Sequence, residues 1–249
     1  MGRMLVALAA NDSRFAVAAA LDRPECGLIG TDVGVIAGIG EIGVPVTQTS
    51  TEFDVIIDFS SPYGTEMAID LALDTKASIV CGTTGLDDAL LRKLNDASAQ
   101  IGVFFAKNFS RGIALCTEIA KQMARAIPEA DIEIIESHHR NKADAPSGTA
   151  LDLARGLCET RGLDFGRDII YCREGHTGVR PKDRIGINAV RGGGIVGEHR
   201  IIFAMPFETL TIEHSAISRE VFAAGALDAS EFIFGKIGFY QMKDLLNQK

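Results

Sequence analysis

The side chains best suited to chemistry stand close together in the run Glu136-Ser137-His138-His139-Arg140-Asn141-Lys142-Ala143-Asp144-Ala145-Pro146-Ser147-Gly148-Thr149-Ala150. Within five residues it places four titratable or cationic groups: His138, His139, Arg140 and Lys142. Histidine exchanges protons near neutral pH, and a positioned lysine can act as a general acid. Positive charge also attracts a carboxylate or a phosphate. The run therefore predicts binding of a small anion coupled to proton transfer.

A predicted strand and a predicted helix flank this run. Apolar and polar residues alternate from Asp131 to Glu136, which indicates a strand. Leucines at positions 151, 153 and 157 indicate a helix from Thr149 onward. The run then lies where a strand ends and a helix begins, and ligands of open α/β proteins bind at such places.

The residues just before the predicted helix suit an anionic ligand. Pro146 has no N–H group to leave unpaired, and Ser147 or Thr149 can cap the first turn. Gly148 lets a ligand approach the backbone closely. An alternative interpretation is a basic surface loop before a capped helix, because His, Lys and Arg are mostly solvated side chains.

The run from Glu136 to Ala150 resembles the signature of the dihydrodipicolinate (4-hydroxy-tetrahydrodipicolinate) reductase family of the diaminopimelate and lysine pathway. The resemblance covers essentially the whole chain. It implies reduction of a small cyclic dicarboxylate by NADH or NADPH, with loss of water from the 4-hydroxy substrate. It also implies that His138 is a proton donor or acceptor and Lys142 the proton donor. The substrate contacts that it implies are His139, Gly148 and Thr149.

Composition and charge limit the classes of function. The chain has 249 residues, enough for one large domain or two modest ones, with an ordinary globular content of apolar and charged residues. A net charge of −8 argues against nucleic acid as a partner, because nucleic-acid-binding surfaces are usually basic. No apolar run approaches the roughly 18 residues that a membrane span needs. The N-terminus has no signal-peptide layout.

The cysteines and the remaining histidines suggest neither disulfides nor a metal. The five cysteines are an odd number, widely spaced and without a Cys-x-x-Cys pair, which suits free thiols in a reducing cytosol. We therefore expect a cytoplasmic protein. His176 and His199 lie in glycine-rich loops without a second ligand at close spacing, so we expect no metal.

Strands and helices alternate through the first half of the chain. Strands are expected at 53–60, 78–81 and 102–106, and helices at 63–73 and 86–99. This order predicts a Rossmann-like, doubly wound parallel sheet. Two turns that follow strands should line the cofactor crevice, and both resemble cofactor contacts of the family. They are Gly82-Thr83-Thr84 and Ala106-Lys107-Asn108-Phe109, although ordinary turn chemistry explains them as well.

The first residues match only the end of the family's cofactor motif. The family opens with a strand and a glycine-rich turn, and here Gly2 and Arg3 correspond to the last part of that turn, followed by a helix over 1–8. The first strand and glycines are absent, and we expect a truncated or misplaced start. Residues 15–22 predict a second strand, after which Asp22 can bind ribose hydroxyls and Arg23 a 2′-phosphate. The pair suggests use of both NADH and NADPH.

The second half changes in character. A long helix over 111–127 is followed by the 131–150 region, and four further strand-like segments then occur without intervening helices, at 167–172, 184–190, 197–205 and 209–215. They predict an α+β domain with a mostly antiparallel sheet. A helix over 221–234 and a short one at 242–246 should return to the first domain, as in the family. Residues 24–50 are rich in glycine and predict an irregular excursion with a short strand near 44–46.

We thus expect a dinucleotide-binding domain of residues 1–109 and 216–249, and a substrate-binding and oligomerisation domain of residues 110–215. Exposed sheet edges can pair with other subunits, and the family resemblance implies a homotetramer. Two other functions stay open. One is an NAD(P)-dependent oxidoreductase for another small acid, and the other is a catalytically silent homologue that lacks the nucleotide loop.

Overall fold

The computed structural model describes residues 1–248, which form two compact units. The first unit consists of Met1–Ser110 together with the chain from Glu220 onward, and the second unit is Arg111–Arg219. Among the described residues, no helix is both long enough and apolar enough to span a membrane. Each unit has its own sheet and its own buried core.

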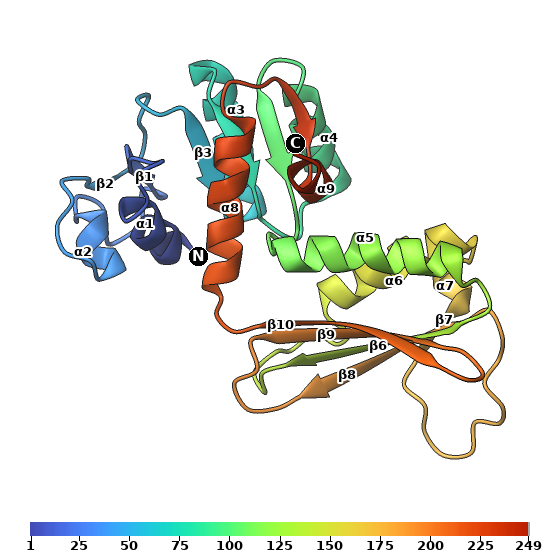
Figure 1. Ribbon diagram of the computed structural model, residues 1–249. Helices are drawn as coiled ribbons and strands as arrows, with labels where there is room; N and C mark the ends of the chain where they lie inside the picture. The colour runs from blue at the N-terminus through green and yellow to red at the C-terminus, as the bar shows by residue number, and fades with distance from the viewer. Residues whose placement is uncertain (249) are drawn as a thin grey trace. The chain divides into compact units, whose positions relative to one another are not determined.

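The first unit is built on a parallel sheet whose strands run in the order β11-β5-β4-β3 (Figure 1). These strands are β3 (Val55–Asp58), β4 (Ser78–Cys81), β5 (Gly102–Phe105) and β11 (Gly238–Tyr240). Helices α3 (Pro62–Thr75) and α4 (Asp88–Ala97) connect β3, β4 and β5, and α8 (Glu220–Ile233) and α9 (Met242–Leu246) flank β11 in the sequence. The parallel α/β order predicted for this half is confirmed. Strand β11, only three residues long, was not predicted.

Both faces of this sheet are covered, as a doubly wound fold requires. Ile79 and Val103 are buried on the face that packs against α3 and α4. Their neighbour Phe104 points to the opposite face, where its ring contacts Phe232 of α8 with the ring centroids 6.1 Å apart. Gly225 of α8 lies so close to the turn after β5 that an added Cβ would stand 1.9 Å from the carbonyl oxygen of Phe109.

The N-terminal region forms smaller elements: α1 (Gly2–Ala10), β1 (Ala20–Leu21), α2 (Val33–Ala37) and β2 (Val46–Thr47). Strands β1 and β2 form a separate parallel pair, and within residues 1–248 no strand pairs with the second edge of β3. The strand predicted over 15–22 is wrong over most of its length, because its first residues have no ladder partner there. The excursion over 24–50 is more ordered than predicted. Asp32 caps α2 and also accepts the N–H groups of residues 42–44.

The second unit contains a five-stranded sheet in the order β10-β9-β6-β8-β7. Its strands are β6 (Asp131–His138), β7 (Ile169–Tyr171), β8 (Ile185–Arg191), β9 (Gly197–Ala204) and β10 (Thr209–Ala216). Strands β9 and β10 are antiparallel to their neighbours, whereas β6, β8 and β7 run parallel. The expectation of a mostly antiparallel sheet therefore needs correction to a mixed sheet. The reason is the crossover through α6 (Gly148–Arg161) and α7 (Phe165–Asp168), which returns the chain in the direction of β6.

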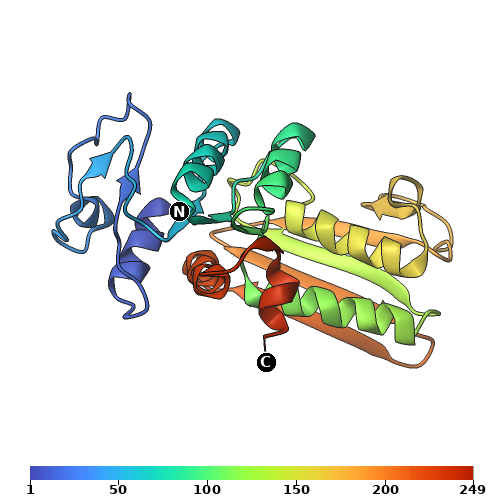
Figure 2. The same ribbon diagram turned by 90° about the horizontal axis from the view of Figure 1, so that it is seen from above.

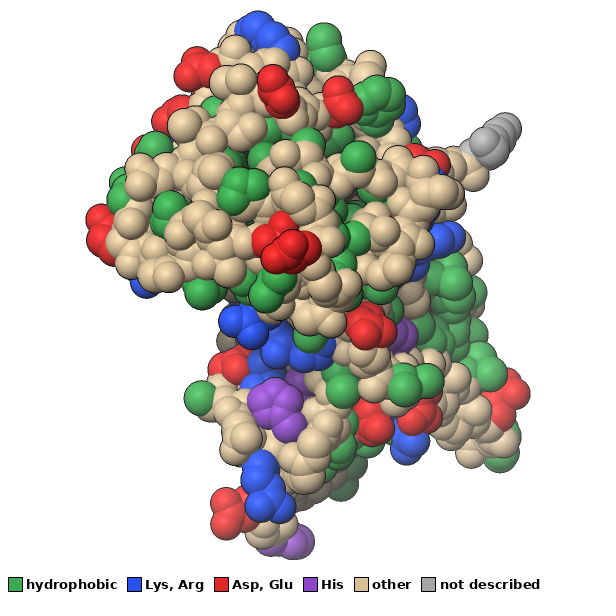
Figure 3. Space-filling model, turned by 90° about the vertical axis from the view of Figure 1, so that its left-hand side faces the viewer, with side chains coloured by type: hydrophobic (Ala, Val, Ile, Leu, Met, Phe, Trp, Pro, Cys, Tyr) green, Lys and Arg blue, Asp and Glu red, His purple; other side chains and the backbone are tan. Residues whose placement is uncertain are grey.

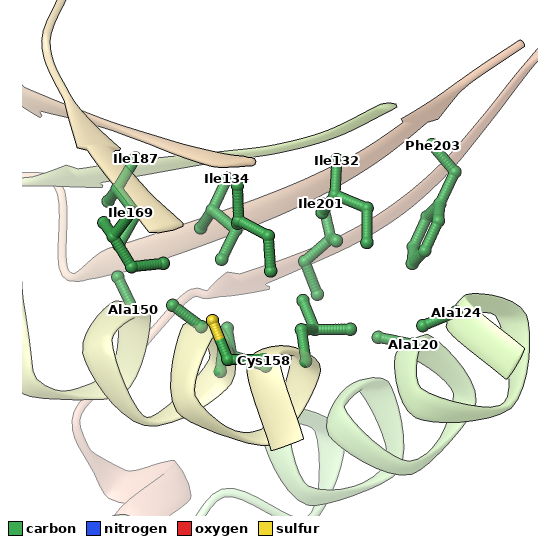
Figure 4. Packing of buried hydrophobic residues seen from close by; sticks show 14 of the residues in the cluster. Ala120, Ala124, Ile132, Ile134, Ala150, Cys158, Ile169, Ile187, Ile201 and Phe203 are labelled. Atoms are coloured by element: carbon green, nitrogen blue, oxygen red, sulfur yellow. The ribbon is translucent and has the colours of Figure 1, made fainter. Parts of the chain in front are cut away.

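Helices α5 (Arg111–Ala126) and α6 lie side by side over one face of this sheet (Figures 1 and 2). Ile132 and Ile134 of β6 point toward them, and small residues such as Ala124 and Ala150 let the helices approach closely (Figure 4). Side chains alternate along a strand. The same face of β6 therefore continues past Ile134 to Glu136 and His138, so the core packing also fixes the direction of these two side chains.

The close contact at Gly225 gives a stability prediction in which two effects oppose one another. Helix propensity alone favours Gly225→Ala by about 1 kcal/mol. The new methyl group would collide with the backbone oxygen of Phe109, which cannot swing aside as a side chain can. We expect the clash to win and the free energy of unfolding to fall by about 1–3 kcal/mol.

Chemical denaturation of purified Gly225→Ala measures this change. Gly27→Ala is the matched control, because nothing lies within 4 Å of a Cβ at Gly27. Its free energy of unfolding should change by no more than about 0.5 kcal/mol. A Gly225→Ala protein that is more stable than the parent would mean that α8 does not pack this tightly.

Candidate active site

A buried carboxylate at the end of β6 forms hydrogen bonds with several elements of the second unit. Glu136 is fully buried. Its Oε1 accepts hydrogen bonds from Arg191 Nη2 at 2.7 Å and from the Ser147 backbone N–H at 3.0 Å. Its Oε2 accepts one from Arg191 Nη1 at 2.8 Å and lies 2.6 Å from His138 Nδ1. One side chain thus connects β6, β8 and the start of α6.

The electrostatics of this cluster keep Glu136 negatively charged. Burial acts to raise the pKa of its carboxyl, because a low-dielectric site disfavours charge. The hydrogen bonds from Arg191, His138 and the Ser147 N–H outweigh burial, and the pKa ends below its ordinary value. Beside its partner, the pKa of the Arg191 guanidinium is raised. Glu136 is therefore an ionised acceptor at neutral pH.

His138 is held by one ring nitrogen and leaves the other for chemistry. An ionised carboxylate can only accept, so His138 Nδ1 donates its proton to Glu136. Nε2 lies over Gly197, where an added Cβ would stand 3.2 Å from it. The absence of a side chain at Gly197 leaves room for the ring in this orientation. The side chain of His138 is 13% exposed.

The start of α6 stands beside this pair. Ser147 is the N-cap residue, and its Oγ accepts the Ala150 N–H at 3.2 Å, so of the two residues predicted as possible caps, Ser147 and Thr149, it is Ser147 that caps α6. Gly148 is exposed, with nothing within 4 Å of the place where a Cβ would stand, and Thr149 is half-buried. A helix N-terminus with such an open first turn suits a carboxylate.

The loop between β6 and α6 carries the positive charge. Lys142 Nζ lies 2.8 Å from Asp144 Oδ1, and the lysine side chain is 21% exposed. The loop is tied to the sheet through Arg191 Nη2, which donates to the Asp144 carbonyl at 2.7 Å. His139 is half-buried, and its carbonyl accepts the Lys142 N–H. In the space-filling view, Lys, Arg and His side chains gather in the lower half of the picture (Figure 3).

His199 on β9 is the second histidine of this cluster. Its ring meets that of His138 edge to face, with centroids 5.4 Å apart, and its Nε2 lies 3.2 Å from Ser147 Oγ. Burial lowers the pKa of His199 to about 4, and the neighbouring His138 acts in the same direction. His199 is therefore neutral at physiological pH, and it adds no positive charge beside His138.

The turns predicted to contact the cofactor follow β4 and β5 in the first unit. Gly82 packs against the Phe59 ring, where an added Cβ would stand 2.2 Å from a ring carbon, so no larger residue fits. Thr83 is buried, and its Oγ1 donates to Asp58 Oδ2 at 2.8 Å. Thr84 is exposed. Asp58, at the end of β3, also accepts the Ser60 N–H and thereby joins the turns after β3 and β4.

The turn after β5 is anchored by its two ends. Ala106 is buried and donates its N–H to the Cys81 carbonyl of β4. Phe109 is buried, with its ring centroid 5.1 Å from that of Phe59. Between them, Lys107 is exposed and Asn108 accepts the Ser110 N–H through its side chain. The carboxyl ends of β4 and β5 thus bring these two predicted turns together.

The other predicted cofactor contacts stand on separate elements of the first unit. Asp22 and Arg23 are exposed just after β1, where the Arg23 N–H donates to Asp22 Oδ1 at 2.8 Å. Gly2 and Arg3 form the exposed beginning of α1. Since β1 pairs with β2 and not with β3, the hydrogen-bonded sheet does not join Asp22 to the Gly82 turn.

Three residues of these sites were not assigned a role from the sequence: Glu136, Arg191 and Asp58. Glu136 was quoted within the motif, and an acid on the apolar face of a strand could have suggested a buried charge that needs a partner. Arg191 carries no such local signal, because only the pairing of β6 with β8 sets it opposite His138. Asp58 lies inside the strand expected over 53–60, whose pattern does not indicate that its carboxylate joins two turns.

The fold defines the class of the protein, which is an α/β protein with a Rossmann-like domain. A parallel α/β unit joined to a unit with a mixed sheet is also the fold of an amine dehydrogenase from Mycobacterium smegmatis. That structure matches 98% of this chain and 92% of its own chain, with a TM-score of 0.60 and 10% identity. Such a low identity establishes the fold alone. The fold class predicted from the sequence, an α/β protein with a Rossmann-like domain, is confirmed.

The chain belongs to the dihydrodipicolinate reductase family, as its resemblance suggested. Models of the N-terminus and C-terminus of dihydrodipicolinate reductase match residues 1–109 and 112–246. Two relatives named 4-hydroxy-tetrahydrodipicolinate reductase, from Acinetobacter baylyi and Alkalilimnicola ehrlichii, are 42% and 41% identical to it. The matches cover 99% of this chain and 92% and 94% of the relatives.

A solved structure of the same family supports this assignment. The dipicolinate-bound dihydrodipicolinate reductase from Paenisporosarcina sp. TG-14 matches with a TM-score of 0.75 and 25% identity, over 96% of this chain and 92% of that one. Family membership identifies the protein as an oxidoreductase related to nicotinamide-dependent reductases.

The neutral state of His199 predicts a pH dependence of stability. Its pKa is about 4 in the folded protein and about 6.5 in an unfolded chain. The unfolded chain therefore binds a proton first as the pH falls, and the free energy of unfolding decreases between about pH 6.5 and pH 4. The His199 contribution to this loss is about 3 kcal/mol.

Denaturant titrations of the parent and His199→Gln near pH 7 and near pH 4 measure this contribution. All other groups titrate in both proteins, so the difference between the two losses isolates His199. The loss on acidification should be smaller in His199→Gln by about 3 kcal/mol. Equal losses would show that His199 takes up its proton without hindrance in the folded protein.

Proposed function

We propose that the protein is a 4-hydroxy-tetrahydrodipicolinate reductase. NADH or NADPH gives a hydride to 4-hydroxy-2,3,4,5-tetrahydrodipicolinate, a proton is taken up, water leaves, and tetrahydrodipicolinate and the oxidised cofactor are formed. The observation that carries the proposal is the cluster at the end of β6. It combines a carboxylate-held histidine with a lysine and an open helix N-terminus within one strand–loop–helix segment. Family membership and the names of the relatives agree with it.

The substrate class follows from the same segment. The exposed first turn of α6 at Gly148 and Thr149 would hold one carboxylate through N–H groups and a hydroxyl. His139 would contact the ligand from the preceding loop. The family structure from Paenisporosarcina sp. holds dipicolinate, a planar cyclic dicarboxylate, which agrees with a substrate of this kind.

Proton transfer would fall to two residues of this segment. His138 presents Nε2 as a proton donor or acceptor, and Lys142 supplies an ammonium group as proton donor. Lys142 Nζ is held 2.8 Å from Asp144 Oδ1, a contact for which a ligand carboxylate would compete. The imidazole of His138 and the ammonium group of Lys142 differ in side-chain length and in charge, so they suit different proton-transfer steps of the reaction.

The residues of the first unit fit a nicotinamide cofactor, which when bound supplies the hydride. At Gly2, nothing lies within 4 Å of the place where a Cβ would stand, and this first residue of α1 leaves room for a pyrophosphate at a helix N-terminus. The turns Gly82–Thr84 and Ala106–Phe109 would lie along the nicotinamide. Asp22 would hold ribose hydroxyls and Arg23 a 2′-phosphate, so both NADH and NADPH would serve.

The two units then divide the work. The first unit would bind the dinucleotide, and the second would bind the substrate and other subunits. A biosynthetic reductase without a membrane-spanning helix among its described residues suits the cytoplasm, where we propose that it acts.

An activity assay with both cofactors tests the function. Oxidation of NADH and of NADPH should depend on freshly generated 4-hydroxy-tetrahydrodipicolinate, and NAD⁺ with amino or hydroxy acids should give no comparable rate. Activity with another small acid instead would make the protein a different oxidoreductase. Failure to bind either reduced cofactor in fluorescence titrations would favour the alternative that this protein is a catalytically silent member of the family.

The role of Lys142 predicts a loss of turnover without a loss of fold. General acid catalysis contributes about 10²–10⁴-fold to a rate, so Lys142→Ala should lower kcat by that order. The matched control is Lys182→Ala, which removes an exposed lysine of the same unit and should keep the parent rate. Circular dichroism checks the fold of both. If Lys142→Ala keeps nearly full turnover, the proton comes from another group.

The sheet of the second unit suggests how subunits associate. Its helices cover one face, while the other carries half-buried Ile135 and Ile202 and the ion pair of Arg200 with Glu213. We propose that this face and the edge strand β10 contact other copies in a homotetramer. Light scattering should give about four times the 26.6 kDa of one chain. The mass of a single chain would contradict the proposal.

A further inference from the structure

We propose that Glu136, braced by Arg191, is a positioning residue that determines which nitrogen of His138 exchanges a proton with the ligand. The inference deepens the proposed function and rests on it, because it concerns a histidine placed in proton transfer. It assigns to Glu136 the task of keeping the Nδ1 proton in place, so that only Nε2 changes its protonation.

The tautomer follows from the donors and acceptors around Glu136. Three donors other than His138 point at its two oxygens: both terminal nitrogens of Arg191 and the backbone N–H of Ser147. The Arg191 guanidinium and the Ser147 N–H stabilise the ionised carboxylate and lower its pKa, so Glu136 carries no proton that it could donate to His138 Nδ1. An ionised carboxylate satisfies them all and still accepts from His138 Nδ1 at 2.6 Å. In neutral His138 the proton therefore sits on Nδ1, and Nε2 carries the lone pair.

The orientation of Glu136 is fixed from three directions. Arg191 cannot follow a moving carboxylate, because its guanidinium also donates to the carbonyls of Val190 and Asp144. The Ser147 N–H belongs to the N-cap of α6, which cannot move without disturbing the helix start. Glu136 is fully buried, so water does not compete for its oxygens. Of the three partners Arg191, Ser147 and His138, only His138 can reorient, by turning its ring.

Nε2 is the ring nitrogen of His138 that has space beside it for proton exchange. It lies over Gly197, where no side chain intervenes. His199 packs against the ring edge to face and is neutral, because burial lowers its pKa to about 4. It therefore puts no second positive charge beside a protonated His138. The arrangement commits Nδ1 to Glu136 and leaves Nε2 to exchange the proton.

Another acid on the same strand provides a matched comparison. Glu133 of β6 accepts hydrogen bonds from Arg173 and from Arg180, and its pKa also ends below its ordinary value. Its hydrogen-bond partners in the described part of the chain are Arg173, Arg180 and Asn188, and none of them is a histidine. Glu133→Gln therefore imitates the loss of charge beside two guanidinium groups without changing any imidazole. It separates a general effect on stability from an effect on His138.

Replacing Glu136 by Gln should reverse the tautomer. The amide oxygen will take the Oε1 position, where the Ser147 N–H and Arg191 Nη2 both donate. The amide nitrogen then faces His138 and offers a hydrogen. His138 must accept through Nδ1, so its proton moves to Nε2. In serine proteases the equivalent change of an acid to its amide traps the wrong histidine tautomer and lowers kcat by about 10⁴-fold.

The test combines a spectroscopic and a kinetic measurement. Nitrogen-15 NMR of the histidine side chains, with His138→Gln to assign the signals, should show the Nδ1–H tautomer of neutral His138 in the parent protein. The Nε2–H tautomer should appear in Glu136→Gln. Turnover of Glu136→Gln should fall by about 10²–10⁴-fold while its affinity for NADH stays unchanged. Glu133→Gln should keep both the parent tautomer and the parent turnover.

A charge-conserving variant covers the case in which Glu136→Gln does not fold. Glu136→Asp keeps an acceptor carboxylate at a shorter reach, so it should retain the Nδ1–H tautomer and more activity than Glu136→Gln. An Nε2–H tautomer in the parent, or Glu136→Gln with parent turnover, overturns the inference. If the parent itself does not reduce the substrate, the proposed function fails instead, and the tautomer measurement still decides the role of Glu136.

Discussion

The second unit depends on one buried negative charge. An unpaired carboxylate in an apolar interior is very costly. A buried carboxyl group therefore loses its proton only where hydrogen-bond donors surround it. Glu136 meets this condition because β8 supplies Arg191, the N-cap of α6 supplies a backbone N–H, and its own strand supplies His138. Each of these elements must be in place for the charge to persist. The pairing of β6 with β8 and the start of α6 therefore determine the surroundings of Glu136 and His138.

A second carboxylate plays a comparable part in the first unit. Asp58 ends β3 and collects the hydroxyls of Thr65 and Thr83 together with the Ser60 N–H. Its partners are neutral, whereas Glu136 has a guanidinium beside it. An acid surrounded by hydroxyls and N–H groups joins the turns after β3 and β4 through hydrogen bonds and forms no ion pair with these partners. The cationic side chains of the candidate site lie instead in the loop between β6 and α6, which carries Arg140 and Lys142.

Local patterns explain what could be predicted from the sequence. Alternation over 131–136 placed Ile132 and Ile134 on one strand, which in the structure runs on to His138, and a cap by Ser147 or Thr149 followed from residue type. Non-local pairing explains what could not. Arg191 meets Glu136 only through the register of β6 with β8, and the crossover that makes these strands parallel is not visible in either strand. The strand expected over 15–22 failed for the same reason, since a ladder needs a partner.

His138 and His199 have identical side chains, but their surroundings give them different properties. His138 has a carboxylate at Nδ1 and is part-exposed. His199 lies deeper, and its contact with the Ser147 hydroxyl brings no opposite charge. Desolvation then dominates and keeps His199 neutral. The two imidazoles thus differ in their surroundings: His138 is hydrogen-bonded to a carboxylate, and His199 packs against its ring without adding charge.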